Sequence, residues 1–310
     1  MSAGPLRVAV IGLGDIAQKA YLPVLTAEPG LELSVMTRDR AKLDRIGEQY
    51  RIARRHTELD GVLAEGLDAA FVHASTRAHV PLVEALLEAG VPVFVDKPLD
   101  YSLSGSRKLV ERAEAAGLSL MVGFNRRYAP GHVEALEHPR DLILLQKNRS
   151  IGPEQARSFV FDDFIHVVDT LRFLAPGAIT RTGVRFRAQD GLLHHLVLEL
   201  SGDGFTALGI MNRLSGSTEE VLELSGQGAK REIVSLGEVI DHTDGRPTLR
   251  RRGDWISVGW QRGFQQMCGA FLDAVRSGVT LSARDALRTH ELCEEIVQQV
   301  EAGGGADPVR

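Results

Sequence analysis

The sequence has few cysteines, few aromatic residues and no long hydrophobic run. Its two cysteines, Cys268 and Cys293, stand outside any CxxC or Cys/His spacing, which argues against a disulfide framework or a zinc site. We expect both to be buried free thiols in a reducing compartment, the cytoplasm. Nowhere do 18 apolar residues follow one another, so no transmembrane helix is expected. The apolar run Val8–Ile11 is too short for the core of a signal peptide.

An excess of positive charge is also absent. The formal net charge is -5 at pH 7, with 25% charged and 44% hydrophobic residues. This balance gives no attraction to phosphate backbones or anionic lipids, so the sequence predicts neither a nucleic-acid partner nor a membrane partner. A chain of 310 residues exceeds what one hydrophobic core usually sustains, which favours two domains.

The hydrophobic pattern of the N-terminal part is typical of a parallel sheet. Short apolar runs alternate there with helical patterns, as in βαβ units. The expected strands are Leu6–Ile11, Leu31–Met36, Ala69–Val72, Pro92–Val95 and Leu118–Val122. Two expected helices end on glycines: Ala78–Ala89 stops before Gly90, and the helix opened by Ser102 stops before Gly117. We predict an α/β domain at 1–122, a Rossmann domain with a doubly wound parallel sheet.

After Val122 the pattern changes to consecutive strands. A strand at Leu142–Lys147 and a helix at Asp163–Leu174 come first. The later strands are expected at Val184–Ala188, Leu192–Leu200, Thr206–Asn212, Glu220–Leu224 and Glu232–Val234, and the closing helices at Phe264–Arg276 and Ala283–Glu301. Strands without intervening helices imply antiparallel pairing, so 123–310 is predicted to be an α+β domain with a large, mostly antiparallel open sheet. We expect Gly303–Arg310 to be a loose tail.

The first expected strand runs directly into a GxGxxA motif, Gly12 to Ala17. Gly12 permits a tight turn, Gly14 lets the backbone approach a pyrophosphate, and the small Ala17 lets the helix pack closely on the strand. Free N–H groups at the start of the helix, at Asp15 and Ile16, would then face the phosphates. The motif predicts a dinucleotide site; a tight turn without a ligand is the alternative.

The end of the second expected strand bears on the choice of cofactor. NAD-preferring folds usually carry an acidic residue there for the ribose 2′-hydroxyl, and this chain has Thr37 and Arg38 instead. These residues suit a 2′-phosphate, with Arg40 as a second cation. NADP is therefore the preferred cofactor. If Arg38 is a solvated loop charge, NAD is the alternative.

Lys97 is the first candidate for catalysis. It follows a buried strand in the sequence Asp96-Lys97-Pro98, at the carboxyl edge of the expected sheet, where ligands bind in doubly wound folds. A lysine near a positively charged nicotinamide has its charged form disfavoured, which suits proton transfer or polarisation of a substrate oxygen. A surface ion pair is the alternative.

The second candidate is a helix with one polar face. Asp162, His166 and Asp169 fall within one arc of the helix. The opposite face carries Phe164, Val167, Val168, Leu171 and Leu174. A solvated face with an i, i+4 pair is the alternative. No metal site is expected, because the nearest other histidines, His194 and His195, lie in a separate strand without ligand spacing, and we interpret both as structural.

Taken together and in this order, four blocks resemble the Gfo/Idh/MocA family of sugar and cyclitol oxidoreductases over nearly the whole chain. The blocks are Val8–Ala17, Asp96–Pro98, Gly123–Tyr128 and Asp162–Asp169. The runs Ala17–Ala20, Phe71–Thr76 and His166–Thr170 look most like the MviM-like branch of that family.

The resemblance implies roles for particular residues. Lys97 becomes the active-site lysine, followed by a cis peptide bond to Pro98, and His166 accepts the proton of the substrate hydroxyl. Asp162 orients substrate hydroxyls and supports the histidine. The expected cofactor contacts are Gly12, Gly14, Asp15, Ile16, Thr37, Arg38, Ser75, Thr76, Asp96, Lys97 and Asn125. The expected substrate contacts are Lys97, Asn125, Arg126, Asp162 and His166.

Three departures from the family pattern bear on the substrate. Asp96 stands in place of the usual glutamate, and Arg77 in place of a common proline. Asp163 and Phe164 replace small residues between the Asp and the His, which would narrow the pocket. The resemblance also implies that the C-terminal domain binds substrate and forms a homodimer or homotetramer through its sheet.

The expected activity is reversible hydride transfer between NAD(P) and a secondary hydroxyl of a sugar, sugar derivative or cyclitol. Two alternatives stay open at this point. One is a non-catalytic dinucleotide-binding sensor or regulatory protein, since a fold does not guarantee chemistry. The other is a reductase of an imine or unsaturated bond.

Overall fold

The strands form two separate sheets, in agreement with the change of pattern after Val122. A computed structural model describes residues 4–303. The chain divides into two compact units: the first contains the residues up to Gly123 together with Phe264–Leu287, and the second contains Phe124–Gly263 together with the residues from Arg288 onward. Within residues 4–303, no helix is both long and apolar enough to cross a membrane.

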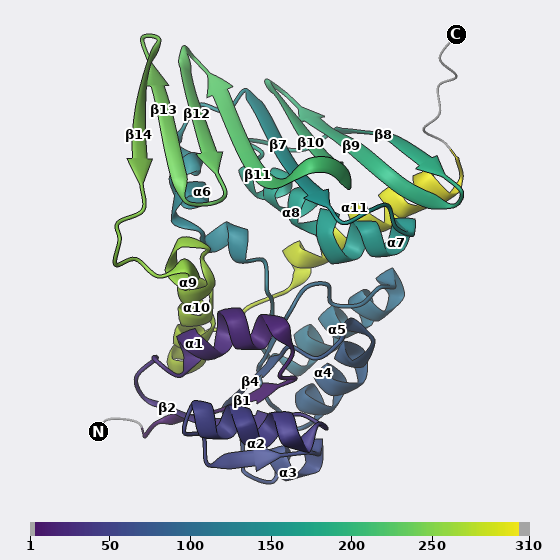
Figure 1. The fold of residues 1–310 in the computed structure, drawn as a ribbon. Helices are drawn as coiled ribbons and strands as arrows, with labels where there is room; N and C mark the ends of the chain where they lie inside the picture. Colours follow the sequence, from purple (N-terminus) through teal and green to yellow (C-terminus); the bar gives the residue numbers. More distant parts are fainter. Residues whose placement is uncertain (1–3, 304–310) are drawn as a thin grey trace. The chain divides into compact units, whose positions relative to one another are not determined.

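The sheet of the first unit has six parallel strands in the order β3-β2-β1-β4-β5-β6, of which β2, β1 and β4 are labelled in Figure 1. The strands are β1 Leu6–Ile11, β2 Leu31–Met36, β3 Arg54–His56, β4 Ala69–Val72, β5 Val93–Val95 and β6 Leu120–Val122. This order confirms the Rossmann prediction. The strand order switches direction between β1 and β4: β2 and β3 lie on one side of this pair, and β5 and β6 on the other. A ligand crevice is therefore expected beyond the carboxyl ends of β1 and β4.

Helical segments connect and flank the strands of this sheet. They are η1 Ala17–Tyr21, α1 Leu22–Leu25, α2 Arg40–Gln49, α3 Leu59–Leu63, η2 Thr76–Ala78, α4 His79–Glu88, α5 Leu103–Ala116 and α10 Phe264–Ser277. The α5 helix has both of its predicted ends. The Ser102 hydroxyl accepts the Gly105 N–H at 3.1 Å, and Gly117 ends the helix with φ +66°.

An aromatic cluster fills the core of the first unit and explains why α10 belongs to it. The Phe271 ring of α10 packs edge-on against Phe71 at 5.2 Å, and the Phe264 ring packs in the same way against Tyr21 at 5.2 Å. Tyr21 also stacks on His73 at 3.8 Å. The core of the N-terminal sheet is therefore completed by residues that lie far along the chain, inside the predicted range 123–310.

The sheet of the second unit has eight strands in the order β14-β13-β12-β11-β7-β10-β9-β8. The strands are β7 Leu142–Ser150, β8 Arg181–Gln189, β9 Leu192–Gly202, β10 Phe205–Asn212, β11 Leu214–Gly226, β12 Ala229–Val234, β13 Glu238–Thr243 and β14 Arg246–Arg251. Only β7 and β10 pair in parallel; the other neighbours are antiparallel. The predicted large, mostly antiparallel sheet is confirmed.

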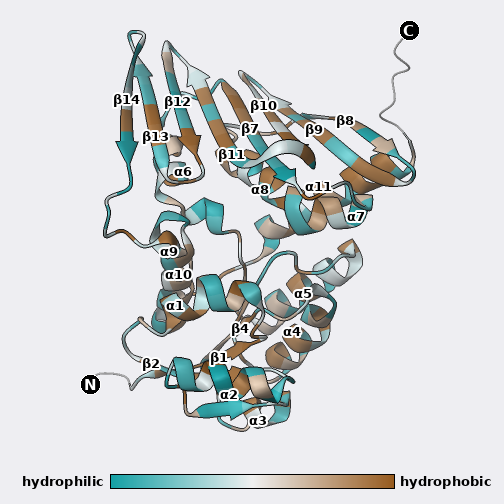
Figure 2. Cartoon of the chain, in the orientation of Figure 1, coloured by the Kyte–Doolittle hydropathy of each residue, from teal (hydrophilic) through white to brown (hydrophobic). Residues whose placement is uncertain are grey.

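Helices cover one face of this sheet. The second unit contains η3 Asn125–Tyr128, α6 Pro130–Glu134, η4 Ala135–Glu137, α7 Ala156–Ser158, η5 Phe159–Phe164, α8 Ile165–Leu174, α9 Val258–Gln261 and all but the first turn of α11 Arg284–Glu301. The α8 helix lies directly on the sheet, because a Cβ at Gly209 would be 2.5 Å from Val167 Cγ1. Buried and half-buried residues alternate along β10 beneath it, and Figure 2 shows hydrophobic residues on this strand and its neighbours.

Candidate active site

The turn after β1 needs glycine at Gly12. This residue has φ +91°, and a Cβ there would be 2.3 Å from the Ala74 backbone nitrogen. Its own N–H donates to the Met36 carbonyl at 2.9 Å. The turn is therefore packed against the end of β2 and the loop that follows β4, and no side chain fits at this position.

Gly14 is under a different constraint. A Cβ there would meet only the His73 carbonyl oxygen, at 4.0 Å, so the packing of the protein leaves room for a side chain. Ala17 is fully buried under the turn, and the Gln18 side-chain amide donates to the Leu13 carbonyl at 2.9 Å. The open space over Gly14 and the adjoining helix start fit a pyrophosphate that lies against the backbone.

The loop after β2 carries the residues that bear on cofactor choice. The Thr37 N–H donates to the His56 carbonyl at 3.2 Å. Arg38 is exposed, and no ion pair joins it to another residue of the described chain. Arg40, in contrast, pairs with Asp44 at 3.1 Å. Arg38 thus has a guanidinium that a phosphate could reach, whereas the predicted second cation already has a carboxylate.

Lys97 stands at the carboxyl end of β5, half-buried, and the Lys97–Pro98 peptide bond is cis as expected. The Asp96 carboxylate accepts the Lys97 backbone N–H at 2.8 Å. Burial raises the pKa of Asp96, and the positive charge of Lys97 opposes that rise. Burial likewise raises the pKa of the Tyr21 phenol well above its ordinary value, and the neighbouring Asp96 adds to the effect. The shorter carboxylate of Asp96 is thus held inside the protein, between Tyr21 and the Lys97 turn.

His79 connects the loops that follow β4 and β5. Its buried imidazole lies between two carbonyl oxygens, with Nδ1 2.9 Å from that of Pro98 and Nε2 3.0 Å from that of Ala74. Ser75 and Thr76, the expected ribose contacts, directly follow Ala74. The first unit therefore brings its predicted cofactor residues to one edge of the sheet, beyond the carboxyl ends of β1, β2, β4 and β5.

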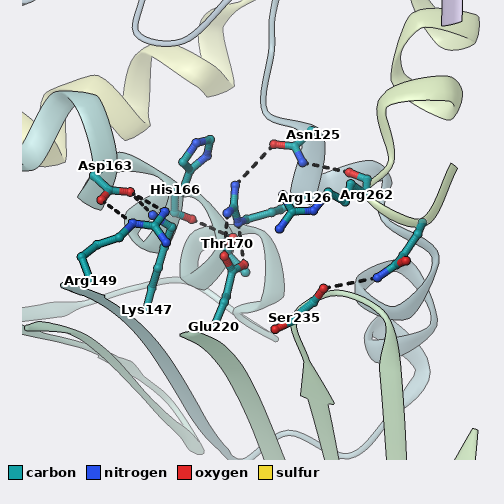
Figure 3. Close-up of polar contacts among 11 residues, drawn as sticks. Asn125, Arg126, Lys147, Arg149, Asp163, His166, Thr170, Glu220, Ser235 and Arg262 are labelled. Atoms are coloured by element: carbon teal, nitrogen blue, oxygen red, sulfur yellow. Dashed lines mark hydrogen bonds and ion pairs between the residues drawn. The ribbon is translucent and has the colours of Figure 1, made fainter. Parts of the chain in front are cut away.

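In the second unit, Asn125 and Arg126 occupy a buried hydrogen-bonded chain (Figure 3). The Arg126 guanidinium donates to both carboxylate oxygens of Glu220, at 2.7 and 2.6 Å, and to Asn125 Oδ1 at 3.4 Å. The Asn125 amide donates onward to the Arg262 carbonyl at 2.8 Å. Burial alone would raise the pKa of Glu220, but the bidentate Arg126 outweighs it and holds that pKa at about 2.

Asp163 organises a second charged group nearby on the same sheet face (Figure 3). Its carboxylate pairs with Lys147, whose side chain is 0% exposed, and accepts Arg149 Nε and Nη2 at 2.9 and 3.1 Å. Lys147 also lies directly opposite Glu220 in the register of β7 and β11. The two charged groups are thus adjacent across one strand pair.

The polar residues of the predicted helix do not share one accessible face. Asp162 is exposed, and His166 is half-buried with its carbonyl accepting the Thr170 hydroxyl at 2.7 Å. Asp169 is only 1% exposed, binds Arg127 Nη2 at 2.7 Å and accepts the Thr289 hydroxyl at 2.9 Å. The assignment of Asp169 to the polar face is wrong. The π-helical turn of η5 shifts the helical phase between Asp162 and Asp169, so uniform α-helical spacing does not describe this segment.

Sequence reasoning passed over Lys147, Arg149 and Glu220, although a signal was present. Lys147 and Arg149 continue the alternation of Ile143 and Leu145 on the covered face of β7. Glu220 precedes Leu222 and Leu224 in the same way on β11. Charged residues at positions where a strand otherwise buries apolar ones indicate a functional polar cluster or an ion pair.

The two cysteines are buried and free, as predicted. Burial raises the pKa of each thiol. Both are therefore inert hydrophobic residues, and neither belongs to the candidate site.

Comparisons with known proteins follow the same division of the chain. Residues 6–124 match the Gfo/Idh/MocA oxidoreductase family with an NAD-binding Rossmann fold, and residues 137–242 match the YceM-like C-terminal domain. The chain is 35% identical to the YceM protein of Salmonella typhimurium, which bears the name of an oxidoreductase, over 88% of this chain and 90% of that one. The chain belongs to the Gfo/Idh/MocA family of oxidoreductases.

Two further relatives support this assignment. The chain is 36% identical to the myo-inositol dehydrogenase Hyg17 of Streptomyces leeuwenhoekii, over 90% of this chain and 89% of that one. The dehydrogenase MviM from Clostridium difficile has the same fold, with a TM-score of 0.90 and 30% identity over 95% of this chain and 99% of that one. The MviM-like character expected from the sequence is confirmed, and the nucleotide of this family is NAD(P).

Proposed function

We propose that this protein transfers a hydride between NADP and a secondary hydroxyl group of a sugar, sugar derivative or cyclitol. The observation that carries the proposal is the difference between two glycines of the Gly12–Ala17 turn. A side chain at Gly12 would clash with the protein, whereas a side chain at Gly14 would clash only with a bound ligand. The similarity to Hyg17, a protein named as a myo-inositol dehydrogenase, supports the substrate class.

The bound nicotinamide would supply the hydride acceptor or donor. His166 takes up the hydroxyl proton at an imidazole nitrogen, and the Lys97 ammonium donates a hydrogen bond to the oxygen as it becomes a carbonyl. Asp162 orients the substrate hydroxyls and supports His166. These roles match the half-buried positions of Lys97 and His166, which shield each group in part while leaving it accessible.

The proposed cofactor contacts follow from the edge of the first sheet. The backbone at Gly12, Gly14, Asp15 and Ile16 would hold the pyrophosphate, and Ser75 and Thr76 would lie beside the ribose. Asp96 would position the Lys97 turn. In the second unit, Asn125 is proposed to contact the nicotinamide end of the cofactor. Arg126 engages Nε and Nη2 with Glu220, so any substrate contact would use its Nη1 edge.

Arg38 supports NADP over NAD, because its exposed guanidinium has no carboxylate partner in the described chain and could bind a 2′-phosphate. Fluorescence titration with NADPH and NADH tests this choice. The protein should bind NADPH at least about tenfold more tightly, and Arg38→Gln should remove most of that difference. Arg40→Gln is the matched control, since Arg40 pairs with Asp44. Equal or tighter NADH binding would contradict the assignment.

The activity itself is tested by nicotinamide absorbance with a panel of cyclitols and aldoses. Lys97→Ala and His166→Ala should each lower kcat by about a hundredfold or more while cofactor binding persists. Cofactor binding without turnover of any panel member would favour a sensor instead. Hydride transfer to imines or enones, but to no carbonyl of the panel, would favour the other reductase class.

A homodimer or homotetramer, formed through the face of the eight-stranded sheet opposite α8, is part of the proposal. A face of this size needs cover unless it is polar. Light scattering coupled to size-exclusion chromatography would give the mass; a monomer across the working concentration range would remove this part of the proposal.

A further inference from the structure

The helix-covered face of the second sheet is apolar at one end and charged at the other. Ile143 and Leu145 occupy the apolar end of β7, and Lys147 and Arg149 follow on the same face. On β10, Met211 is buried on this face, and the buried Arg213 continues it just beyond the strand. Charges that replace apolar residues in a covered layer cost free energy unless partners compensate them.

Two of the cations at this end share one carboxylate. Lys147 and Arg149 both pair with Asp163, whereas Arg126 and Arg213 pair with Glu220 and Glu154. The Lys147 side chain is 0% exposed and that of Asp163 13%, so this group is largely shielded from water.

Arg149 is the cation best placed to meet a ligand. Its side chain is 26% exposed, against 0% for Lys147, and its Nε and Nη2 bind Asp163. Among residues 4–303, its Nη1 group has no hydrogen-bond partner. Burial lowers the pKa of Arg149, as do the charges of Arg126, Arg213 and Arg262, whereas Glu220 opposes them.

This charged end adjoins the proposed proton acceptor. His166 follows Asp163 by three residues on the same helical segment, and its ring lies above the Lys147–Arg149–Asp163 group in the view of Figure 3. A ligand that offers a hydroxyl to His166 would thus have its further substituents within this part of the second unit.

We propose that the substrate is an anionic sugar or cyclitol, whose carboxylate or phosphate binds Arg149 while a ring hydroxyl faces His166. This inference rests on the proposed function and adds the charge of the substrate to it. Arg149 binds such a group as a guanidinium binds any oxyanion, by charge-assisted hydrogen bonds from its outer N–H groups. A neutral polyol would leave Lys147 and Arg149 sharing the single carboxylate of Asp163.

The alternative role for this charge is to stabilise only the alkoxide that forms during the reaction. That role would favour neutral and anionic substrates alike, because every secondary alcohol passes through the same developing charge. A permanent anion on the substrate, in contrast, strengthens binding before any reaction. Ground-state affinity therefore separates the two roles.

The test compares matched probes on the protein saturated with NADP+. D-glucuronate is paired with D-glucuronamide, and D-glucose 6-phosphate with D-glucose, so that the two pairs also distinguish carboxylate from phosphate. Calorimetry gives Kd, and nicotinamide absorbance gives kcat/KM. The variants are Arg149→Gln, Arg149→Lys and Arg54→Gln, the last an exposed arginine of the first unit that pairs with Glu32 at 3.0 Å.

In at least one pair, the anionic member should bind about tenfold or more tightly than its neutral partner. Arg149→Gln should remove most of that preference, Arg149→Lys should keep part of it, and Arg54→Gln should keep all of it. Because Lys147 still pairs with Asp163, Arg149→Gln should melt close to the wild-type temperature.

Three outcomes decide the matter. No tighter binding of either anion, or a preference that survives Arg149→Gln, overturns the inference. Turnover of neutral probes without preference overturns it too, but leaves the proposed function standing. Tighter, Arg149-dependent binding of an anion without nicotinamide turnover supports the anion site and counts against the proposed hydride transfer.

Discussion

At the scale of single residues, the two glycines of the dinucleotide turn have separable roles. Gly12→Ala should cost about 2 kcal/mol or more, because its Cβ would overlap the Ala74 backbone and its φ is +91°. Gly14→Ala should leave the unfolding free energy within about 0.5 kcal/mol of wild type and yet abolish nucleotide binding. Urea unfolding and NADPH fluorescence titration measure the two effects. Tight NADPH binding by Gly14→Ala would show that no phosphate lies there.

His73 makes the stability of the first unit depend on pH. It is buried, neither ring nitrogen has a hydrogen-bond partner among the described residues, and burial together with His79 lowers its pKa from 6.5 to about 3. Since protonation is easier in the unfolded chain, the titration of this residue costs no stability above pH 6.5 and destabilises the folded state increasingly as the pH falls toward 3.

The stability of His73→Leu relative to the wild type should therefore increase as the pH falls. The difference in unfolding free energy between the two proteins should grow by about 2 kcal/mol or more between pH 7 and pH 4.5. Urea midpoints across that range provide the measurement. Parallel pH profiles for the two proteins would mean that His73 titrates normally in the folded state.

At the scale of elements, the position of α8 depends on a missing side chain. Gly209→Ala would place a Cβ 2.5 Å from Val167 and 2.8 Å from Leu171, so the helix must move away from β10. The variant should lose about 1 to 3 kcal/mol of stability and, because α8 carries His166, several-fold of kcat. Gly183→Ala on β8 is the control, since its Cβ would lie 3.7 Å from that of Glu199. Equal behaviour of the two variants would contradict this account.

The elements that the sequence predicted well are those with a clear hydrophobic period. β1, β2 and β4 have the predicted bounds, because each contains at least three consecutive buried residues, most of them apolar. β3, β13 and β14 were missed. Arg54–His56 has no apolar residue, and every residue of Arg246–Arg251 is exposed, so strand pairing rather than side-chain burial defines β3 and β14.

The candidate site was predictable only where a motif has a fixed spacing. The Gly12 turn and the cis Lys97–Pro98 bond lie where the motifs indicate. The adjacency of the Asp163 and Glu220 groups depends on pairing across β7 and β11, which are some seventy residues apart, and no local pattern carries that register. Asp169 was misplaced because one π-helical turn rotates the following residues.

At the scale of the whole chain, the Rossmann unit depends on a distant segment. Residues 1–123 alone would expose Phe71 and Phe94, which pack against Phe271 of α10. This fragment should bind hydrophobic dyes and unfold without a sharp transition. Co-expression with residues 264–287 should restore cooperative unfolding, whereas the same segment with Phe271→Ser should not. Cooperative unfolding of 1–123 by itself would contradict the dependence.

His79 has a consequence for redesign of the nucleotide preference. One imidazole links the loop of Ser75 with the turn of Lys97, so an insertion or a bulky replacement in either loop will be transmitted to the other. The loop of Thr37 and Arg38 is held by a different contact, the hydrogen bond from the Thr37 N–H to the His56 carbonyl. Laboratory evolution that trades one coenzyme for the other can therefore vary Thr37 and Arg38 freely while leaving the reactive lysine in register.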